Sequence, residues 1–208
     1  MPDGVEVLPR GVSLEGVLRF TEVAARALEA AREEVDALNV YPVPDGDTGT
    51  NMYLTIAAAR DAVETAVAQA GGPAQCGVGP GLEALGRGAL LGARGNSGVI
   101  LSEMLRALAR RLAEAGPDDR AAAVMAEGMR LAADAAYAAV GTPVEGTMLT
   151  VARAAAEAAG EAVVDPSART RDVLTAAAAA AREALAATPQ QLQVLADAGV
   201  VDAGGRGF

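Results

Sequence analysis

Two aspartates separated by one glycine are the residues of this chain best suited to chemistry. Asp45 and Asp47 flank Gly46, and two prolines, Pro42 and Pro44, stiffen the chain before them. Carboxylates at this spacing can converge on one hard cation in a turn, because glycine lets the backbone fold tightly around it. The segment is not an EF-hand calcium loop, since an isoleucine stands where the closing glutamate is required.

The residues that follow these aspartates predict an anion site. They begin a helix, where unpaired backbone amides and the helix dipole favour negative charge. A cation site beside an anion site suggests Mg²⁺ bound to phosphate groups. The alternative for the Asp-Gly-Asp segment alone is a turn that caps the helix and binds nothing. The candidate contacts at this helix start are Thr48, Gly49, Thr50, Asn51 and Met52.

A second glycine-rich segment, residues 92–98, leads into another apolar helix. Its small residues let backbone amides approach a phosphate, and Ser97 is both an N-cap candidate and a hydroxyl donor. Arg94 is a candidate for adding positive charge there. The alternative is an ordinary corner between two helices, and the segment alone favours neither. The candidate phosphate contacts are Gly95, Asn96, Ser97 and Gly98.

Two further loops next to helix ends complete the set of candidates. Thr147 can cap a helix while Met148 offers a soft apolar surface to a nucleotide base, although the pair taken alone favours a capped helix start without a ligand. In the last loop, Asp202 and Gly204 accompany Arg206, which is another candidate for stabilising negative charge, although this segment taken alone indicates only a flexible loop. Four loops of this kind exceed what helix connections require. We expect them to line one rim of a helical barrel.

The residue types that the chain lacks exclude several mechanisms. Its 208 residues contain no His and no Lys, and all 17 basic residues are Arg. Catalysis by a Ser-His-Asp triad, a P-loop lysine or a Schiff base is therefore excluded. The net charge of −10 without a concentrated basic patch argues against nucleic acid as a partner.

Nothing in the sequence indicates export or membrane insertion. Residues 1–6 have neither the basic nor the apolar part of a signal peptide, and the apolar runs fall short of the roughly 18 residues that span a bilayer. The single cysteine, Cys76, cannot form an internal disulfide. We expect a cytoplasmic protein.

The elements that must position these loops are helices. Apolar residues recur at helical spacing, no segment alternates like a strand, and alanine is abundant. The sequence therefore predicts an all-α bundle of about eight helices that forms one domain over residues 1–208. Residues 71–81 and the glycine-rich end are expected as loops, and Ser13 as an N-cap. The predicted helices cover residues 14–38, 50–69, 82–91, 97–115, 118–140, 147–162 and 170–187, with a last helix opening at Thr188-Pro189.

Four motifs resemble the N-terminal domain of FakA, the family of bacterial fatty acid kinases. The most specific is Asn-Val-Tyr-Pro-Val-Pro-Asp-Gly-Asp-Thr-Gly-Thr-Asn-Met at residues 39–52, and residues 92–102, 141–149 and 201–207 follow in the family's order. The resemblance spans about residues 13–208. The domain is related to DhaL, the ADP-binding subunit of dihydroxyacetone kinase, in which a His stands at the position of Thr48. That difference favours the fatty acid kinase branch.

The resemblance implies an eight-helix antiparallel barrel with ATP or ADP and two Mg²⁺ ions in a funnel at one end. Of three metal-binding aspartates in DhaL, two carry over to Asp45 and Asp47, and the nearest match to the third is Asn39. The implied nucleotide-lining residues are Ser97, Gly98, Thr147, Met148 and the segment from Asp202 to Gly204.

The resemblance also implies a reaction and a partner. In FakA systems a separate FakB-type protein carries the fatty acid, whose carboxylate attacks the γ-phosphate of ATP to give an acyl phosphate. A carboxylate needs no general base, which agrees with the absence of His. One alternative is a DhaL-like phosphotransfer subunit that acts on a small triose, and another is a nucleotide-binding module without catalysis. We further expect the chain to be the N-terminal part of a longer protein that can form homo-oligomers through its later domains.

Overall fold

A computed structural model describes residues 12–208 as ten helices, with no strand among them. This confirms the all-α prediction, whereas the expectation about a signal peptide concerns residues 1–6, which lie outside the described part. The seven long helices are α1 (Leu14–Ala37), α2 (Thr48–Ala70), α4 (Val78–Gly92), α5 (Gly95–Ala113), α6 (Ala121–Ala138), α7 (Met148–Ala162) and α8 (Thr170–Gln191). The short helices are α3 (Pro73–Cys76), α9 (Gln193–Ala198) and α10 (Ala203–Gly207).

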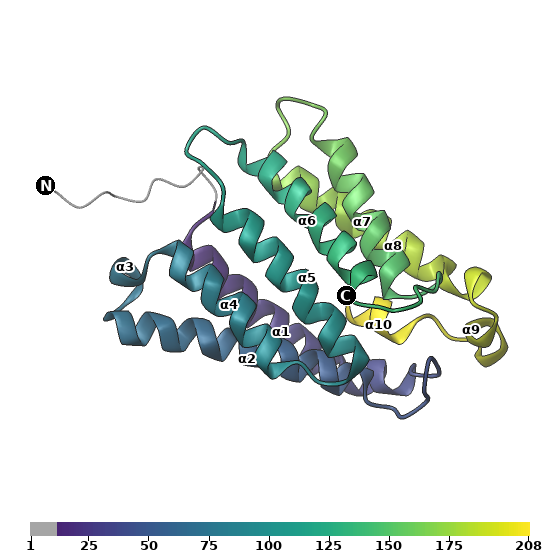
Figure 1. Ribbon diagram of the computed structural model, residues 1–208. Helices are drawn as coiled ribbons and strands as arrows, with labels where there is room; N and C mark the ends of the chain where they lie inside the picture. Colours follow the sequence, from purple (N-terminus) through teal and green to yellow (C-terminus); the bar gives the residue numbers. More distant parts are fainter. Residues whose placement is uncertain (1–11) are drawn as a thin grey trace, which may run out of the picture.

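Each long helix packs against the next one along the chain, in the order α1, α2, α4, α5, α6, α7, α8. Consecutive long helices run in opposite directions (Figure 1). The short helix α10 contacts α1, α2 and α7, and so joins the two sides of the bundle. This alternation places the connections after α1, α4 and α6 at the same end of the bundle as α10 (Figure 1).

Small and aliphatic side chains build the interior. The largest fully buried side chains include Met52, Ile56 and Leu82, and alanines fill many of the helix contacts between them. Glycines bring two pairs of helices especially close. A Cβ on Gly49 would lie 2.4 Å from the carbonyl oxygen of Arg32, and one on Gly88 would lie 2.5 Å from the Cβ of Ala62. The aromatic-poor composition is therefore compatible with tight packing.

The predicted N-caps of α1 and α7 are confirmed. The Ser13 hydroxyl accepts a hydrogen bond from the Gly16 amide at 3.1 Å, and the Thr147 hydroxyl accepts one from the Leu149 amide at 3.4 Å. The expectation of a loop over residues 71–81 is wrong, because Pro73 opens the short helix α3 and α4 begins at Val78. Proline suits the first turn of a helix, where its missing N–H is not needed.

The expected helix start at Thr188-Pro189 is also wrong, since α8 continues through both residues to Gln191. Proline has no amide to donate to the carbonyl four residues earlier, which belongs to Leu185. The Thr188 hydroxyl donates to that carbonyl at 2.7 Å instead. This hydrogen bond satisfies the carbonyl and lets the helix pass the proline.

The glycine-rich C-terminal segment forms helix α10 instead of the expected loop. Asp202 caps it, because its carboxylate accepts a hydrogen bond from the Gly205 amide at 2.7 Å. The glycines fit against larger side chains, since a Cβ on Gly207 would lie 2.6 Å from the Met52 sulfur. Asp202 and the close fit of the glycines together explain why this segment is helical.

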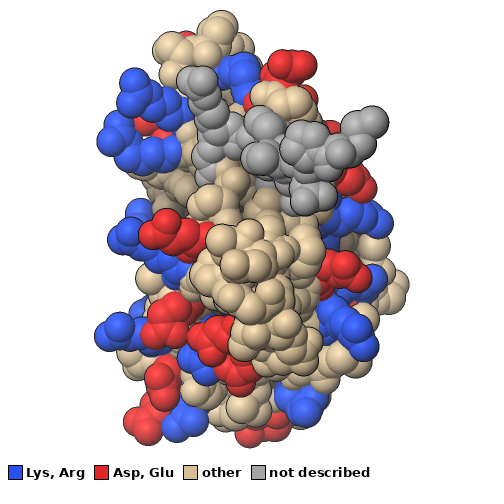
Figure 2. Space-filling view, turned by 90° about the vertical axis from the view of Figure 1, so that its left-hand side faces the viewer, with Lys and Arg blue, Asp and Glu red and all other residues tan. Residues whose placement is uncertain are grey.

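The opposite end of the bundle, which carries α3, has a mixed surface. Figure 2 shows an uncharged central area bordered by interspersed Arg and acidic side chains. Within residues 12–208, no helix is long and apolar enough to cross a membrane.

A matched pair of glycine substitutions tests the packing. Gly88→Ala should lower the free energy of unfolding by about 1–3 kcal/mol, because the new methyl group would also lie 2.8 Å from the Ala58 carbonyl oxygen. Gly160→Ala in α7 should raise it by about 0.5–1 kcal/mol, since nothing lies within 4 Å of the added carbon. Urea denaturation measures both changes. A Gly88→Ala chain that is as stable as the unsubstituted chain, or more stable, would contradict the close contact of α2 and α4.

Candidate functional site

A cavity of about 540 Å³ lies at the end of the bundle where α2, α5, α7 and α10 begin. All four loops singled out in the sequence contribute to its lining. The structure therefore brings together segments that are far apart along the chain. The predicted site residues that line it are Asn39, Asp45, Asp47, Thr48, Gly95, Asn96, Ser97, Thr147, Met148, Asp202 and Gly204.

One of the candidate metal ligands, Asn39, has a side-chain amide that is only partly hydrogen-bonded. Asn39 is only 7% exposed, and its Nδ2 donates a hydrogen bond to Oδ1 of Asp45 at 2.7 Å. Its own Oδ1 is buried and has no hydrogen-bond partner in the described part of the chain. A buried acceptor without a partner is costly, so this oxygen is suited to a ligand that carries positive charge.

The donor set at this position fits Mg²⁺. Residues 12–208 hold no cluster of three or more His, Cys, Asp or Glu side chains placed to bind a metal. The available oxygens are instead the carboxylates of Asp45 and Asp47 and the buried amide oxygen of Asn39, and all three residues line the cavity. Mg²⁺ is commonly held by one or two carboxylates with phosphate oxygens and water completing its shell.

The first turn of α2 has backbone amides beside the cavity that find no side-chain acceptor within residues 12–208. Its N-cap, Asp47, makes no side-chain capping hydrogen bond. The Thr50 amide and hydroxyl donate to the carboxylate of Asp36, at 3.0 and 2.7 Å. The structure gives no side-chain acceptor for the amides of Thr48 and Gly49 among the residues it describes.

Asp36 is a residue that the sequence analysis missed. It lies in the last turn of α1 and fixes the start of α2 through Thr50. Its position in the sequence could have pointed to it. A carboxylate near the C-terminus of a helix interacts unfavourably with the helix dipole, so hydrogen-bond donors outside that helix stabilise it. The partner itself, 14 residues further along the chain, could not be read from this pattern.

Helix α5 begins beside α2 and also points into the cavity. Its N-cap is Arg94, which makes no capping hydrogen bond through its side chain. The prediction of Ser97 as the N-cap is therefore wrong, because Ser97 lies inside the first turn of the helix. Gly95 has a φ of +57°, and a Cβ there would lie 2.2 Å from Nδ2 of Asn51. The Ser97 Oγ lies 3.5 Å from the carbonyl oxygen of Thr48, so the two helix starts adjoin. Their positive ends together favour an anion at this point.

Several predicted contacts lie behind the cavity wall instead of on it. Met52 is fully buried in the core, and Gly98 packs so closely that a Cβ would lie 2.5 Å from Oγ1 of Thr55. The contacts visible for these residues hold α2, α5 and α1 together. A direct contact with a nucleotide stays a prediction for Gly49, Thr50, Asn51, Met52 and Gly98.

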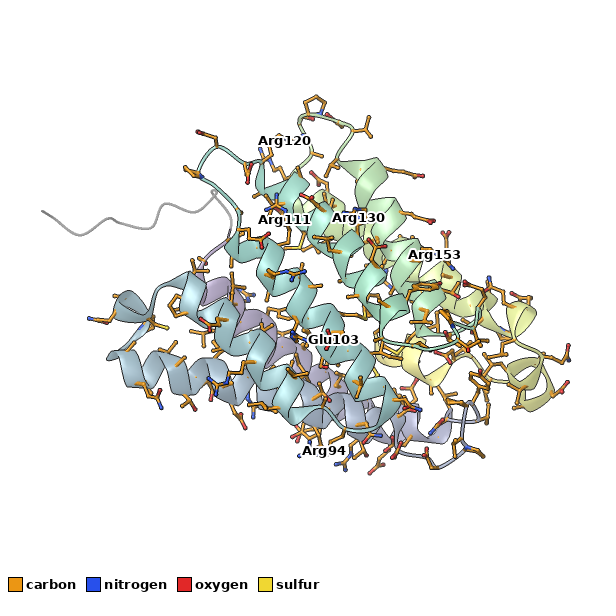
Figure 3. All side chains as sticks on the ribbon, in the orientation of Figure 1. Arg94, Glu103, Arg111, Arg120, Arg130 and Arg153 are labelled. Carbon is orange, nitrogen blue, oxygen red and sulfur yellow. The ribbon has the colours of Figure 1, made fainter. Side chains whose placement is uncertain are left out.

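Neither of the two candidate arginines lines the cavity. Arg94 donates a hydrogen bond to the carbonyl of Ala93 at 2.9 Å and lies at the outer edge of the turn before α5 (Figure 3). Arg206 forms two hydrogen bonds with the carboxylate of Glu34, at 2.8 and 3.0 Å, which tie α10 to α1. A role for either guanidinium in stabilising negative charge stays a prediction.

One wall of the cavity is apolar and was not anticipated. Tyr41 and Val43 belong to the recognised 39–52 motif, so position alone could have suggested them. Pro42 lies in the same motif, and Val99, Ile100, Gly141, Thr142, Val144 and Leu149 lie in the recognised motifs at residues 92–102 and 141–149. Ala139 and Val140 lie outside these motifs, and the packing of the bundle places them here. The additional lining residues are Tyr41, Pro42, Val43, Val99, Ile100, Ala139, Val140, Gly141, Thr142, Val144 and Leu149.

Asp202 adds a buried carboxylate to the cavity. It is 5% exposed, and its amide donates to the Thr188 hydroxyl at 3.1 Å. Burial raises the pKa of its carboxyl from 3.8 to about 6, and hydrogen bonds from the Gly205 and Met148 amides limit the rise. Asp202 thus combines a capping role with a position at the site.

An all-helical bundle with a cavity at one end, lined by aspartates and helix starts, is compatible with a kinase-related, DhaL-like nucleotide-binding module. The family comparison agrees with this class. The DAK2 domain family matches residues 42–208, and the chain belongs to this family.

The relatives of the chain are longer staphylococcal proteins without an assigned function. One from Staphylococcus epidermidis is 44% identical over 184 residues, one from Staphylococcus saprophyticus is 44% identical over 187, and one from Staphylococcus aureus strain USA300 is 40% identical over 187. Each match covers 88% of this chain and 32% of the relative. The chain therefore spans about a third of the length of these relatives.

The raised pKa of Asp202 predicts a specific pH dependence of stability. Between about pH 4 and pH 6 the carboxyl binds more protons in the folded than in the unfolded state. Its contribution is therefore fully present below about pH 4 and is lost as the pH rises through 6, by about 3 kcal/mol at most. Asp202→Asn removes the titration and keeps an oxygen for the cap.

Urea denaturation between about pH 4 and pH 7 measures this effect. Relative to the unsubstituted chain, the stability of Asp202→Asn should increase as the pH rises. A difference that stays constant across the range would show that Asp202 titrates at its ordinary pKa.

Proposed function

We propose that the chain is the Mg²⁺- and ATP-binding domain of a kinase that phosphorylates the carboxylate of a fatty acid. The observation that best supports nucleotide binding is the unpaired, buried Oδ1 of Asn39. This residue donates a hydrogen bond to Asp45 and lines the cavity together with the starts of α2 and α5, which have no side-chain cap. Oxygen donors for a cation and amides for an anion meet there. Their combination matches a metal-bound polyphosphate better than either ligand alone.

The charge of the cavity supports a metal-dependent mode of binding. Its described lining contains the carboxylates of Asp45, Asp47 and Asp202 and no arginine. A bare polyphosphate would be repelled by these groups. Asn39, Asp45 and Asp47 would hold Mg²⁺, two ions being expected from the family resemblance, and the bound metal supplies the positive charge that phosphoryl transfer requires.

The chain's own groups would then bind and orient the nucleotide. Backbone amides at the starts of α2 and α5 would donate to phosphate oxygens, with the Ser97 hydroxyl as a further donor. The apolar wall, with Met148, would pack against the base. A volume of about 540 Å³ lies within the usual range for small-molecule sites, roughly 300–1,000 Å³.

The identity of the phosphoryl acceptor is the more specific part of the proposal. A fatty-acid carboxylate attacks as the anion and needs no general base, in agreement with a chain that has no His and no Lys. The motif at residues 39–52, with threonine at position 48, favours the FakA branch of the family. In this scheme a FakB-type protein holds the acyl chain, the carboxylate oxygen forms a bond to the γ-phosphorus, and ADP departs.

Substituting the carboxylates tests the metal site. Asp45→Asn and Asp47→Asn should each abolish binding of Mg-ADP and Mg-ATP without loss of helix content, because each removes a metal ligand at the edge of the fold. Isothermal titration calorimetry and circular dichroism measure the two properties. Chelating the metal with EDTA should abolish nucleotide binding by the unsubstituted chain.

Asp118→Asn is the matched control, since Asp118 is an exposed aspartate in the connection between α5 and α6, away from the cavity. It should bind Mg-nucleotide normally. Unchanged affinity in both Asp45→Asn and Asp47→Asn would contradict the metal assignment, and global unfolding of both would indicate a purely structural turn.

The chain alone is expected to bind Mg-ATP but not to turn it over with free oleate. The proposed acceptor is presented by a carrier protein, and the chain spans about a third of its relatives' length. A steady-state assay of ATP consumption, with and without oleate, is the measurement. Robust oleate-dependent turnover by residues 1–208 would show that this chain contains the acceptor site and would contradict the division between the two proteins.

A further inference from the structure

The connection between α6 and α7, residues 139–147, forms one wall of the cavity. Ala139, Val140, Gly141, Thr142, Val144 and Thr147 all line it. Several of these positions are exposed to solvent, so core packing does little to hold the middle of the segment. The affinity of the cavity for a ligand therefore depends on what fixes this wall.

A single carboxylate ties the segment to both neighbouring helices. Glu145 accepts a hydrogen bond from the Thr150 hydroxyl at 2.6 Å, and the Tyr137 hydroxyl lies 3.2 Å from each of its oxygens. It also forms an ion pair with Arg153. Tyr137 belongs to α6, whereas Thr150 and Arg153 belong to α7. Glu145 itself does not line the cavity.

Two partners of Glu145, Arg153 and Tyr137, also contact each other. The Arg153 guanidinium lies 4.3 Å from the centre of the Tyr137 ring, within the range of a cation–π contact. Figure 3 shows Arg153 on α7, on the side of the connection and not within the bundle. The hydrogen bond from Arg153 lowers the pKa of Glu145, and burial raises the pKa of Tyr137 to about 12.

Gly146, the next residue, also fixes the segment, through contacts with α7 and with the end of α8. Gly146 has a φ of +78°, and its amide donates to the Thr150 hydroxyl at 2.9 Å. A Cβ at Gly146 would lie 2.9 Å from the Cβ of Leu192 and 3.0 Å from the carbonyl oxygen of Thr188. The Thr150 hydroxyl thus joins Gly146 to Glu145, and the wall is fastened at its C-terminal end.

We infer that Glu145 is a positioning residue of the nucleotide site, which holds the 139–147 wall in its binding geometry by linking that segment to α6 and α7. This inference rests on the proposed nucleotide-binding function. A wall that is already in place costs no ordering free energy when the ligand binds. When the competent conformation becomes a minor one, the apparent dissociation constant rises in proportion.

A graded set of substitutions tests the inference, with calorimetric titration of Mg-ADP as the readout. Glu145→Ala removes every contact of the Glu145 carboxylate and should raise the dissociation constant about tenfold, as expected when the competent fraction falls to about a tenth. Glu145→Gln keeps an oxygen for Tyr137 and Thr150 but loses the ion pair, and should give an intermediate effect. Tyr137→Phe keeps the ring under Arg153 and should change the constant less than twofold, roughly.

Asp134→Asn is the matched control. It breaks an exposed ion pair on α6, Arg130–Asp134, of the same kind but without contact to the connection. Its nucleotide affinity should equal that of the unsubstituted chain. Equal affinity in Glu145→Ala and the unsubstituted chain would overturn the inference.

Hydrogen exchange without nucleotide separates this inference from the proposed function. In Glu145→Ala and Glu145→Gln, amides of residues 139–147 should exchange faster while those of α2 and α5 are unchanged. Unchanged exchange at 139–147 would overturn the inference even where the chain binds Mg-ADP. If the unsubstituted chain binds no Mg-nucleotide, the proposed function fails, and faster exchange in the variants would still support the link through Glu145.

Discussion

The close approach of α2 and α5 at their first turns is the contact on which the rest of the site depends. Gly95 leaves room for the Asn51 amide, and Gly98 leaves room for the Thr55 hydroxyl. Side chains at either glycine would force the two helix starts apart. Because these starts adjoin, their backbone amides and dipoles act on the same point of the cavity. Two helix ends separated by a few more ångströms would give two weak anion sites.

Contacts from distant parts of the chain hold this pair in place. Asp36 at the end of α1 binds the first turn of α2, and Arg206 in α10 binds Glu34 in α1. The Thr188 hydroxyl lets α8 pass Pro189 and also accepts from the Asp202 amide, which orients α10. The same small set of polar side chains therefore completes the bundle and shapes the cavity.

The electrostatics of the molecule favour a ligand that brings its own cations. The chain carries a net charge of −10, and the described lining of the cavity contains three aspartates. Helix dipoles offset part of this negative potential, but a polyphosphate needs a stronger counter-charge. A metal at Asn39, Asp45 and Asp47 would provide that charge and satisfy the unpaired Asn39 oxygen.

The sequence by itself determined the helical class, most long helices, the caps at Ser13 and Thr147, and the four loops of the site, because helical periodicity, capping and glycine placement act over a few residues. It misjudged the helices around Pro73, Thr188 and Gly204, although the hydrogen bonds from Thr188 to Leu185 and from Gly205 to Asp202 are local. It did not reveal Asp36, the apolar wall or the contacts of Glu145. These features depend on partners brought close only by packing, such as the hydroxyl of Thr50 for Asp36. Tertiary structure alone decided them, since a hydrogen bond between distant residues leaves no periodic trace in the sequence.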